Sequence, residues 1–521
     1  MTTPRRPDPA VAATRPQRPP RTRISELAAE LSTDLGGAVT LAGDPDTVVT
    51  GLSLSSSRIL PGDLYAALPG SRTHGIEYAE QAVDAGAVAV FTDQAGIDRV
   101  NSASAVLAGV PVLLAREPRR LLGRLAARVY GHPATQMRMI GVTGTQGKTT
   151  TTRLLAGGLE LAGISAGVIG TVGTRINGRD VKTTLTTPEA PDLHALFALM
   201  VEQGVEACAM EVSSHALVMG RVDGVVFDVA VFLNLGRDHL DFHGSVEDYY
   251  RAKASLFTPE RARLGVVCLD DEHGRRLAKE AEIPVVTYSG AGARATWRAR
   301  GVDLGPRGSD FRLRGPRTRL RVHVPLPGDF NVTNAVAALA ATAEAGLDVE
   351  AVAAGLGEGE GVPGRLERIE AGQDFTVVVD YAHKPDAVEA AVRTLRPLTE
   401  GRVIVVLGAG GDRDQGKRPI MGEIAARLAD VLVVTDDNPR TEDPAEIRAA
   451  VLAGTGRGRA EVVEIGDRRE AIAEAVRRAE PGDIVLIAGM WHETGQEVAG
   501  VVHPFDDRQV ARETLHTLDE A

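Results

Sequence analysis

The stretch MRMIGVTGTQGKTT, residues 137–150, joins an apolar run to a glycine-rich turn. The run 137–143 predicts a strand, and residues 148–161 after the turn predict a helix. Glycines let backbone N–H groups crowd a phosphate, a helix N-terminus adds positive potential, and Lys148 neutralises charge. The hydroxyl of Thr149 can bind Mg²⁺. We therefore interpret the turn as a nucleotide phosphate loop.

The loop is a variant of the common pattern, because the usual Walker spacing would place a glycine at Val142. A turn with a purely structural role is the alternative. The candidate ATP-binding residues of this stretch are Gly144, Thr145, Gln146, Gly147, Lys148, Thr149 and Thr150.

The chain on either side of the loop follows an α/β pattern. In the last third, four apolar runs each end in a polar or glycine motif, and helical segments separate them. Such runs predict a parallel sheet buried on both faces, with ligands beyond the carboxyl ends of its strands. At about 150 residues per domain, the chain has room for three or four domains. We expect a disordered proline-rich tail (1–23), a small α/β domain (24–134), a central nucleotide-binding domain (135–362), a linker at 355–363 and a C-terminal Rossmann-like domain (363–521).

Composition excludes several classes of protein. The 58 Lys and Arg against 70 Asp and Glu give a formal charge of −12, which disfavours a nucleic-acid or acidic-membrane binder. Cys208 and Cys268 are too few for a disulfide scaffold, and their apolar surroundings indicate buried thiols. No apolar run is long enough to cross a bilayer, and the N-terminus lacks the features of a signal peptide. We expect a cytoplasmic protein.

A lysine stands where a hydrophobic residue is expected. As a helix capped by Ser245, residues 246–257 place Val246, Tyr249, Tyr250, Lys253, Leu256 and Phe257 on one face. One interpretation is a lysine that snorkels at the edge of the face. The other is an inward lysine of depressed pKa, whose neutral amine could react with CO₂ to form a carbamate. Periodicity does not decide between them.

Ten motifs in order make the chain similar to the Mur ligases, and among them to the diaminopimelate-adding tripeptide synthetases. The resemblance runs from about residue 54 to residue 510. The motifs are Gly144–Thr150, Thr186–Pro188, Met210–His215, Asp238–Asp241, Tyr250–Lys253, Phe330–Asn334, Gly364–Glu367, Asp380–His383, Gly410–Pro419 and Asp437–Arg440.

The resemblance implies a three-domain α/β fold with a central ATPase-like domain. It implies ATP-dependent addition of diaminopimelate to the D-Glu γ-carboxylate of UDP-MurNAc-L-Ala-D-Glu through an acyl phosphate, in peptidoglycan precursor synthesis. It further implies a monomer with small-molecule partners, without nucleic acid or membrane insertion. The implied cofactors are ATP, two Mg²⁺ ions and a CO₂-derived carbamate on Lys253.

The resemblance also implies the site residues. The catalytic residues would be Lys148, His239, Lys253, Arg365 and His383. Further ATP contacts would come from Asn331, Asn334, Arg365 and Asp380, and the metals would be held by Thr149, Glu211, His239 and carbamylated Lys253. The UDP-dipeptide would meet Ser57, Ser71, Arg72, Thr73, Thr186, Thr187, Ser213 and Arg221. The amino acid would meet Arg413, Asp437, Asn438, Pro439, Arg440, Gly489 and Glu493.

The sequence departs from the family pattern in a few places. Met490 and Trp491 stand where lysine and glycine are usual, and Ser56 stands where an aspartate is usual. Gly236 and Leu185 replace a common serine and asparagine. The alternatives are a paralogue that ligates a different amino acid or amine for a specialised metabolite, a folylpolyglutamate synthetase, and an inactive binding protein. Intact Lys148 and Lys253 disfavour the last of these.

Overall fold

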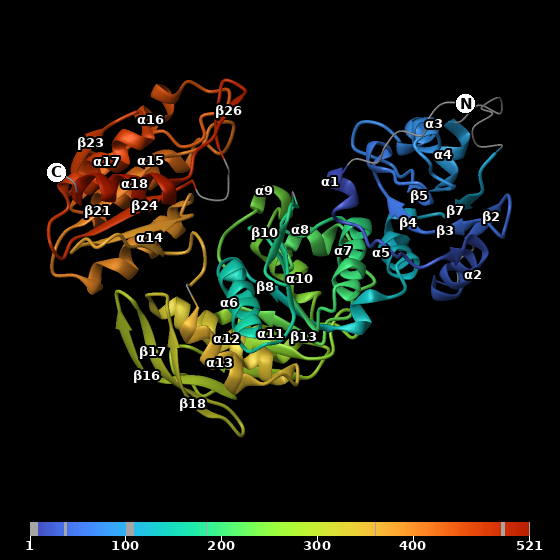
Figure 1. The fold of residues 1–521 in the computed structure, drawn as a ribbon, viewed down its shortest axis with the longest axis horizontal. Coiled ribbons are helices and arrows are strands. Elements are labelled where there is room, and N and C mark those ends of the chain that lie inside the picture. The colour runs from blue at the N-terminus through green and yellow to red at the C-terminus, as the bar shows by residue number, and fades with distance from the viewer. Residues whose placement is uncertain are drawn as a thin grey trace. The chain divides into compact units, whose positions relative to one another are not determined.

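The computed structural model describes residues 9–35, 39–99, 109–183, 185–359, 361–490 and 495–519. The chain divides into two compact units, Met1–Arg298 with Val336–Gly355, and Ala299–Ala335 with Leu356–Ala521. Each unit combines helices with mostly parallel sheets, as the fold class predicted (Figure 1). Among the described residues, no helix is both long and apolar enough to span a bilayer.

The first sheet of unit 1 has five strands in the order β2-β7-β6-β5-β4. All neighbours are parallel except β2 and β7. Helix α5 carries Leu125 and Val129 into the core of this sheet, where they meet alanines of α7 (Ala190–Glu202). The strands are Thr40–Ala42 (β2), Gly51–Ser53 (β4), Asp63–Ala66 (β5), Ala89–Thr92 (β6) and Val112–Leu114 (β7); the helices are Ile24–Leu35 (α2), Ala79–Asp84 (α3), Gln94–Arg99 (α4) and Pro118–Val129 (α5).

The second sheet of unit 1 has β8 in its interior, in the order β11-β10-β9-β12-β8-β13-β14-β15. The six strands from β9 through β12, β8, β13 and β14 to β15 are parallel, and β10 and β11 form an antiparallel edge. The strands are Arg138–Thr143 (β8), Ala166–Gly170 (β9), Gly173–Ile176 (β10), Arg179–Val181 (β11), Ala207–Glu211 (β12), Val229–Phe232 (β13), Gly265–Cys268 (β14) and Val285–Ser289 (β15); the helices are Lys148–Leu161 (α6), Ala190–Glu202 (α7), Ser214–Val218 (α8), Leu240–His243 (α9), Val246–Ala254 (α10) and Glu272–Glu280 (α11).

Unit 2 contains the parallel sheet expected in the last third of the chain. Its order is β19-β20-β24-β21-β22-β23, and only the edge strand β19 is antiparallel. The strands are Glu367–Ile369 (β19), Thr376–Asp380 (β20), Val403–Leu407 (β21), Val431–Val434 (β22), Glu461–Glu464 (β23) and Ile484–Ala488 (β24); the helices are Pro385–Leu395 (α14), Lys417–Leu428 (α15), Pro444–Leu452 (α16), Arg468–Arg478 (α17) and Asp507–Asp519 (α18).

Shorter and connecting elements complete the chain. A two-stranded hairpin, Gln496–Val498 (β25) and Val501–His503 (β26), follows β24. Antiparallel pairing joins Gly308–Arg314 (β17) to Arg319–Val324 (β18). The others are Pro9–Ala12 (α1), Thr22–Arg23 (β1), Val48–Val49 (β3), Trp297–Gly305 (β16), Asp329–Glu344 (α12) and Val349–Glu358 (α13).

The prediction of a disordered tail is wrong for the described residues 9–23. The side chain of Arg15 is 4% exposed, donates to the Tyr130 hydroxyl and lies 3.8 Å from the Asp63 carboxylate. The Glu202 carboxylate accepts the backbone N–H groups of residues 17 and 18. A buried cation needs a paired anion, and this anion lies far away in the sequence. Composition alone therefore could not show that the segment is anchored.

The linker expected at 355–363 begins later than predicted, because α13 continues to Glu358. Gly355 lies inside this helix. A Cβ atom there would come within 2.8 Å of the Gly158 carbonyl oxygen on α6. The glycine thus marks a close approach of two helices, which the sequence pattern does not distinguish from a flexible segment.

The burial of His194 should make the free energy of unfolding depend on pH. His194 is fully buried on α7, and burial lowers its pKa to about 4. Since the unfolded chain binds a proton near pH 6.5 and the folded chain does not, the free energy of unfolding falls as pH drops from 6.5 towards 4, by about 1.4 kcal/mol per pH unit. Urea unfolding at pH 7 and pH 5 should show a larger loss in the parent than in His194→Gln, in which only the other buried histidine of lowered pKa, His383, still contributes. Equal losses in both would contradict it; exposed His516→Gln is the control.

Candidate functional site

The phosphate loop lies where three neighbouring strands end. β8 runs into Gly144, β12 ends at Glu211 beside Val142, and Asn234 follows β13 on the other side of β8. The carboxyl ends of parallel strands share one edge of the sheet, so these residues meet there. Gly147 caps α6 with φ +85°, a backbone conformation that favours glycine. The structure thus confirms the predicted strand-loop-helix.

An asparagine that the sequence analysis missed holds the loop in shape. The Asn234 side-chain oxygen accepts the N–H groups of Thr145 at 3.2 Å and Gln146 at 2.9 Å, and its amide donates to the Gln146 carbonyl at 3.2 Å. The signal that could have revealed it is its place just after an apolar strand run.

Two lysines converge on one carbonyl of the loop. The ammonium of Lys148 donates to the Gly144 oxygen at 2.9 Å and to the Thr145 oxygen at 3.0 Å. The Nζ of Lys253 donates to the same Gly144 oxygen at 2.8 Å and lies 4.5 Å from the centre of the Tyr249 ring. Lys253 is 1% exposed, so the inward interpretation is confirmed and the snorkelling one is wrong. Burial and the nearby Lys148 charge hold the Lys253 pKa well below its usual value.

The carboxylate of Glu211 is buried in a shell of hydroxyl and N–H groups. It accepts the Thr149 hydroxyl at 2.8 Å, the Thr171 N–H at 2.9 Å and the Thr171 hydroxyl at 3.1 Å. Thr171 follows β9 directly, and sequence reasoning did not single it out. These contacts fix the carboxylate next to the first turn of α6.

His239 joins this group through aromatic contacts. It precedes α9 with φ +52°, a left-handed backbone that residues other than glycine rarely adopt. Its ring lies 4.8 Å from the His215 ring and 6.3 Å from the Tyr249 ring. The Tyr249 hydroxyl lies 3.2 Å from the Thr145 hydroxyl. Lys148, Glu211, His239 and Lys253 are therefore linked around one loop.

The side chains fit a Mg²⁺ ion bound mainly through a nucleotide. Among the described residues, no group of three or more His, Cys, Asp or Glu side chains is arranged to hold a metal. Glu211 and Thr149 offer one carboxylate and one hydroxyl, both hard oxygen ligands. Mg²⁺ commonly takes one or two carboxylates and completes its shell with phosphates and water. The depressed pKa of Lys253 likewise suits carbamate formation, which needs a neutral amine.

Four of the residues expected at the UDP-dipeptide lie close to Glu211. The Thr186 and Thr171 hydroxyls are 3.1 Å apart, and the Thr187 hydroxyl donates to the Glu211 carbonyl at 2.9 Å. Ser213 caps α8 and accepts the Ala216 N–H, while the Arg221 guanidinium donates to the Thr187 carbonyl at 3.3 Å. Of the remaining four, Ser57 lies in the 3₁₀ helix Ser56–Arg58 that follows β4, and Ser71, Arg72 and Thr73 lie in the loop after β5.

In unit 2, the expected nucleotide contacts occupy two short stretches. Asn331 and Asn334 are buried on α12, where the Asn331 amide donates to the Pro327 carbonyl at 2.8 Å. At the end of β20, the Asp380 carboxylate accepts the Leu366 N–H at 2.8 Å. The Arg365 guanidinium lies 5.2 Å from the centre of the Tyr381 ring. Burial lowers the pKa of nearby His383 to about 4, so its ring is neutral at pH 7.

The residues expected at the amino acid lie at the carboxyl ends of β21, β22 and β24. Asp437 and Asn438 are buried, and Arg440 has φ +54° and donates to the Gly411 carbonyl at 2.6 Å. A Cβ at Gly489 would come within 2.5 Å of the Asp437 carboxylate, so this position needs a glycine. Arg413 is exposed. Glu493 lies outside the described residues, as does Trp491.

The hairpin β25–β26 holds this loop, and the sequence analysis did not anticipate it. The Arg440 N–H donates to the Glu497 carbonyl at 2.8 Å, and the Ala499 N–H donates to the Arg440 carbonyl at 2.7 Å. The Gln496 amide donates to the Asp437 carbonyl at 2.6 Å, and the Asn438 oxygen accepts the Glu497 N–H at 2.5 Å. Four hydrogen bonds thus stabilise an arginine in a strained backbone conformation.

The departures from the family pattern cause no visible distortion where the structure describes them. Ser56 donates to the Gln81 side chain at 2.9 Å, and the Gly236 N–H donates to the Thr145 hydroxyl at 2.9 Å. Met490 is buried, and Leu185 is 40% exposed.

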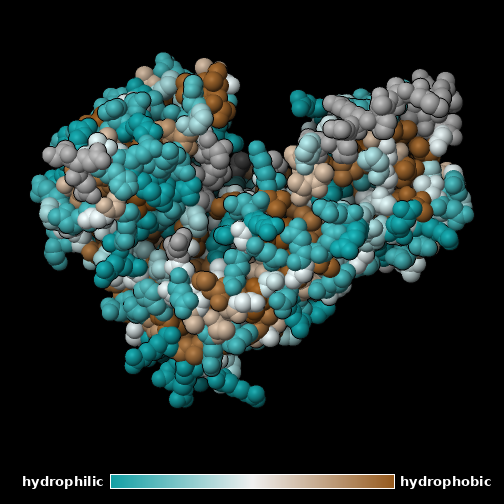
Figure 2. Space-filling view, in the orientation of Figure 1, coloured by the Kyte–Doolittle hydropathy of each residue, from teal (hydrophilic) through white to brown (hydrophobic). Residues whose placement is uncertain are grey.

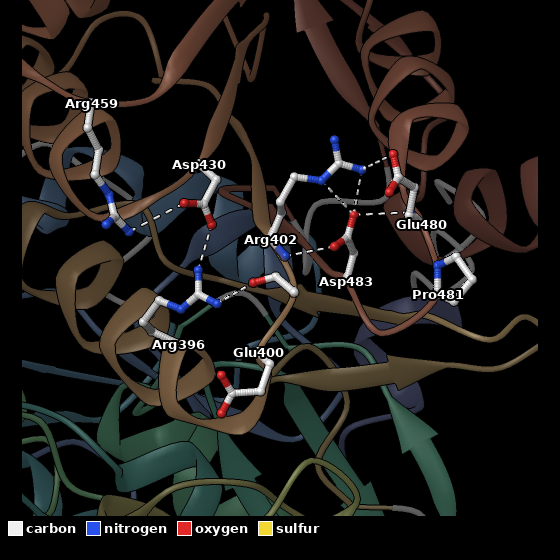
Figure 3. A pocket seen from close by; sticks show the side chains of 9 residues that line it. Arg396, Glu400, Arg402, Asp430, Arg459, Glu480, Pro481 and Asp483 are labelled. Carbon is white, nitrogen blue, oxygen red and sulfur yellow. Dashed lines mark hydrogen bonds and ion pairs between the residues drawn. The ribbon is translucent and has the colours of Figure 1, made fainter.

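A separate hollow of about 520 Å³ lies at the opposite edge of the C-terminal sheet, just before β21, β22 and β24 (Figure 3). Ion pairs join Arg396 to Asp430 and Arg402 to Asp483 across it. Because its cations are already paired and no predicted site residue lines it, we do not assign it to the chemistry.

The chain is similar to known proteins along most of its length. Residues 48–130 match the Mur ligase family catalytic domain, 142–342 the Mur ligase middle domain and 364–490 the Mur ligase glutamate ligase domain. A Streptomyces coelicolor protein named UDP-N-acetylmuramoyl-L-alanyl-D-glutamate--2,6-diaminopimelate ligase is 55% identical over 508 residues, 96% of this chain and 98% of its own. A Corynebacterium glutamicum protein of the same name is 49% identical, over 90% and 92% of the two chains.

A solved structure of a UDP-N-acetylmuramoyl-L-alanyl-D-glutamate--2,6-diaminopimelate ligase is 33% identical, with a TM-score of 0.69 over 96% of this chain and 100% of that one. Both the sequence matches and this structural match extend along nearly the whole chain. The chain belongs to the Mur ligase family.

Proposed function

We propose that this chain is an ATP-dependent ligase of peptidoglycan precursor synthesis, which adds diaminopimelate to the D-Glu γ-carboxylate of UDP-MurNAc-L-Ala-D-Glu. The observation that carries the proposal is the meeting of Lys148, Glu211 and Lys253 at one phosphate loop. Relatives named for this reaction match the chain over nine-tenths or more of its length. The unpaired thiols Cys208 and Cys268 suit the reducing cytoplasm, our proposed location.

Residues of the loop activate the carboxylate. The backbone N–H groups of residues 144–150 and the Lys148 ammonium bind the terminal phosphates of ATP and stabilise the charge that develops as the γ-phosphoryl group leaves. The substrate carboxylate oxygen takes that phosphoryl group, giving an acyl phosphate and ADP. The amine then attacks the acyl carbon, phosphate leaves with the bonding pair, and the amine loses a proton as the amide forms.

Thr149 and Glu211 would hold one Mg²⁺, and His239 with carbamylated Lys253 a second. When bound, these ions neutralise the repulsion between the carboxylate and the triphosphate. Glu211 is held for this role by Thr171. For the remaining nucleotide contacts we propose Asn331, Asn334, Arg365, Asp380 and His383, on the resemblance to the family.

Hydroxyl and guanidinium groups would bind the UDP-dipeptide. Thr186, Thr187 and Ser213 lie within two hydrogen bonds of Glu211, which supports their proposed role beside the substrate carboxylate. Arg221 carries a charge that suits an anionic substrate. The other proposed contacts are Ser57, Ser71, Arg72 and Thr73.

The loop Asp437–Arg440 would recognise the amino acid. Arg440 suits the distal carboxylate of diaminopimelate, a group that lysine lacks. Arg413 would bind the other carboxylate, and Asp437, Asn438, Pro439, Gly489 and Glu493 would complete the pocket. Lysine offers no distal carboxylate to Arg440, so its binding is disfavoured.

The deciding experiment is ATP-dependent phosphate release by the purified chain with the UDP-dipeptide. We expect turnover with diaminopimelate and at least tenfold less with lysine or other amines, and mass spectrometry of the product should show the tripeptide. Testing the meso and LL forms separately will identify the preferred stereoisomer. Efficient turnover of another amine, with diaminopimelate inert, would favour a paralogue and overturn the proposal.

The Arg440→Ala variant should lose kcat/KM for diaminopimelate by about 30-fold to several thousand-fold, because loss of a hydrogen-bonded charge pair costs roughly 2–5 kcal/mol. The KM for ATP should stay within about twofold. Steady-state phosphate release with each substrate varied checks both. An unchanged preference for diaminopimelate over lysine would remove Arg440 from recognition.

The Gln496→Ala variant should raise the KM for diaminopimelate about three- to tenfold, since it removes one hydrogen bond that fixes the recognition loop. The KM for ATP and for the UDP-dipeptide should not change. Gln509→Ala on α18, where the side chain is exposed and bonded to Glu513, is the control. Equal rises for all three substrates would point to a general loss of structure.

A further inference from the structure

A buried ion pair lies inside unit 2. The side chains of Arg468, the first residue of α17, and Asp507, the first residue of α18, are both 0% exposed. The guanidinium donates to the two carboxylate oxygens from Nε and Nη2, each at 2.7 Å. Figure 2 shows mostly hydrophilic atoms where Figure 1 draws α15 to α18, so other polar side chains of this region face water. Removing two charges from water costs free energy, even when they are paired.

The guanidinium of Arg468 also reaches the ends of two strands. Its Nη1 donates to the Asp436 carbonyl at 3.3 Å, and its Nη2 donates to the Ala488 carbonyl at 3.1 Å. Asp436 follows β22, and Ala488 ends β24. In the sheet β21 lies between these two strands, so ladder hydrogen bonds do not join β22 to β24 directly. Arg468 therefore links two strand ends across the strand that separates them.

Each of the two carbonyls precedes a residue of the proposed amino-acid pocket. Asp437 follows Asp436, and Gly489 follows Ala488. A Cβ atom at Gly489 would lie 2.5 Å from the Asp437 carboxylate and 3.9 Å from Nη2 of Arg468, so the three groups are close neighbours. A carbonyl and the N–H of the next residue lie in one planar peptide unit. By holding both carbonyls, Arg468 orients the backbone where it enters Asp437 and Gly489.

Stability alone does not account for this arrangement. Well-packed apolar residues often replace a buried ion pair without loss of stability. A second ion pair, Arg402 with Asp483, lies at the other edge of the same sheet (Figure 3). Arg402 donates to the Asp483 carboxylate at 3.0 Å and 2.8 Å, and to the Arg478 carbonyl at 2.7 Å. None of the described residues of the proposed amino-acid pocket lines the hollow in which this second pair lies.

We propose that Arg468, held by Asp507, is a positioning residue for the incoming amino acid. It sets the place of the recognition loop, Asp437–Arg440, relative to Gly489. This role rests on the proposed function, in which the loop and the glycine belong to the amino-acid pocket. A loop that shifts presents Arg440 to the distal carboxylate less often, so binding of the amino acid weakens. ATP and the UDP-dipeptide are proposed to bind other residues, so their KM values should not respond.

The test is steady-state kinetics of the full chain with each substrate varied. Arg468→Lys keeps the positive charge, but an ammonium cannot form the planar fork that meets Asp507 and both carbonyls. We expect its KM for diaminopimelate to rise about fivefold or more, because hydrogen bonds to two strand ends are lost, while the other two KM values stay within about twofold. Its preference for diaminopimelate over lysine should fall, which a uniform loss of active protein would leave unchanged. Arg402→Lys is the matched control and should keep all three KM values within about twofold of the parent.

The double variant R468M/D507L separates positioning from folding. Methionine and leucine remove both charges and fill the space with apolar atoms, so the melting temperature should stay within about 4 °C of the parent. The KM for diaminopimelate should rise at least as much as in Arg468→Lys. An unchanged KM for diaminopimelate, an equal rise in all three KM values, or the same rise in Arg402→Lys would overturn the proposal. So would the failure of both Arg468 variants to fold, since Arg468 would then serve the fold alone.

The parent protein distinguishes this proposal from the proposed function. If the parent ligates another amine in place of diaminopimelate, the proposed substrate is wrong, and the same comparison is made with that amine. A KM rise confined to that amine would still support the role of Arg468, and an unchanged KM would exclude it. A parent that ligates no amine would overturn both.

Discussion

The Lys253→Ala variant is expected to show no measurable ATP-dependent ligation. Lys253 is the one charged side chain on the buried face of α10, 1% exposed, with its Nζ 2.8 Å from the Gly144 carbonyl of the phosphate loop. Because burial and Lys148 depress its pKa, the neutral amine is available to react with CO₂. Methyl replacement removes both the amine and any carbamate formed on it. Phosphate release under saturating substrates measures the loss.

Chemical rescue separates the carbamate role from a structural one. If a carbamate on Lys253 is required, acetate or another short carboxylic acid should restore part of the activity of Lys253→Ala, by supplying a carboxylate in the space left behind. Arg251→Ala, on the exposed face of the same helix, should retain the activity of the parent. Normal turnover by Lys253→Ala without added acid would exclude the carbamate role.

The Lys148→Ala variant should also lose turnover, by about a thousandfold or more in kcat. The Lys148 ammonium donates to two loop carbonyls, at 2.9 Å and 3.0 Å. Among the described residues, Lys253 is the other cation bonded to this turn. Removing one preorganised hydrogen-bond donor that stabilises transition-state charge typically lowers the rate by about 10² to 10³. The Lys148 ammonium carries a full positive charge, so its removal should cost at least as much.

Binding measurements will show whether the Lys148 effect is on the chemistry. Calorimetric titration with the UDP-dipeptide should give the same affinity for Lys148→Ala and the parent, because the proposed contacts of that substrate are elsewhere. Lys182→Ala, which removes an exposed lysine at the end of β11, is the control. A kcat within tenfold of the parent would contradict the proposed role of Lys148.

Long-range contacts account for what the sequence did not predict at the site. The loop-forming residues 144–150 are contiguous, so their chemistry could be seen directly in the sequence. Asn234 bonds the loop from 88 residues away, and Thr171 bonds Glu211 from 40 residues away, across strands whose order no local pattern reveals. The same holds for Gln496, whose partner Asp437 is 59 residues distant.

By itself, the sequence determined the α/β class, the phosphate loop and the parallel C-terminal sheet, because hydrophobic periodicity and turn residues are local properties. The tertiary structure alone decided that Lys253 points inward, that Arg15 is buried against Tyr130, and that Arg468 pairs with Asp507. Each of these depends on which distant segments are neighbours. Which segments become neighbours depends on the burial of the apolar faces of helices and sheets. The free energy of that burial is distributed over many residues, so no single stretch of sequence predicts it.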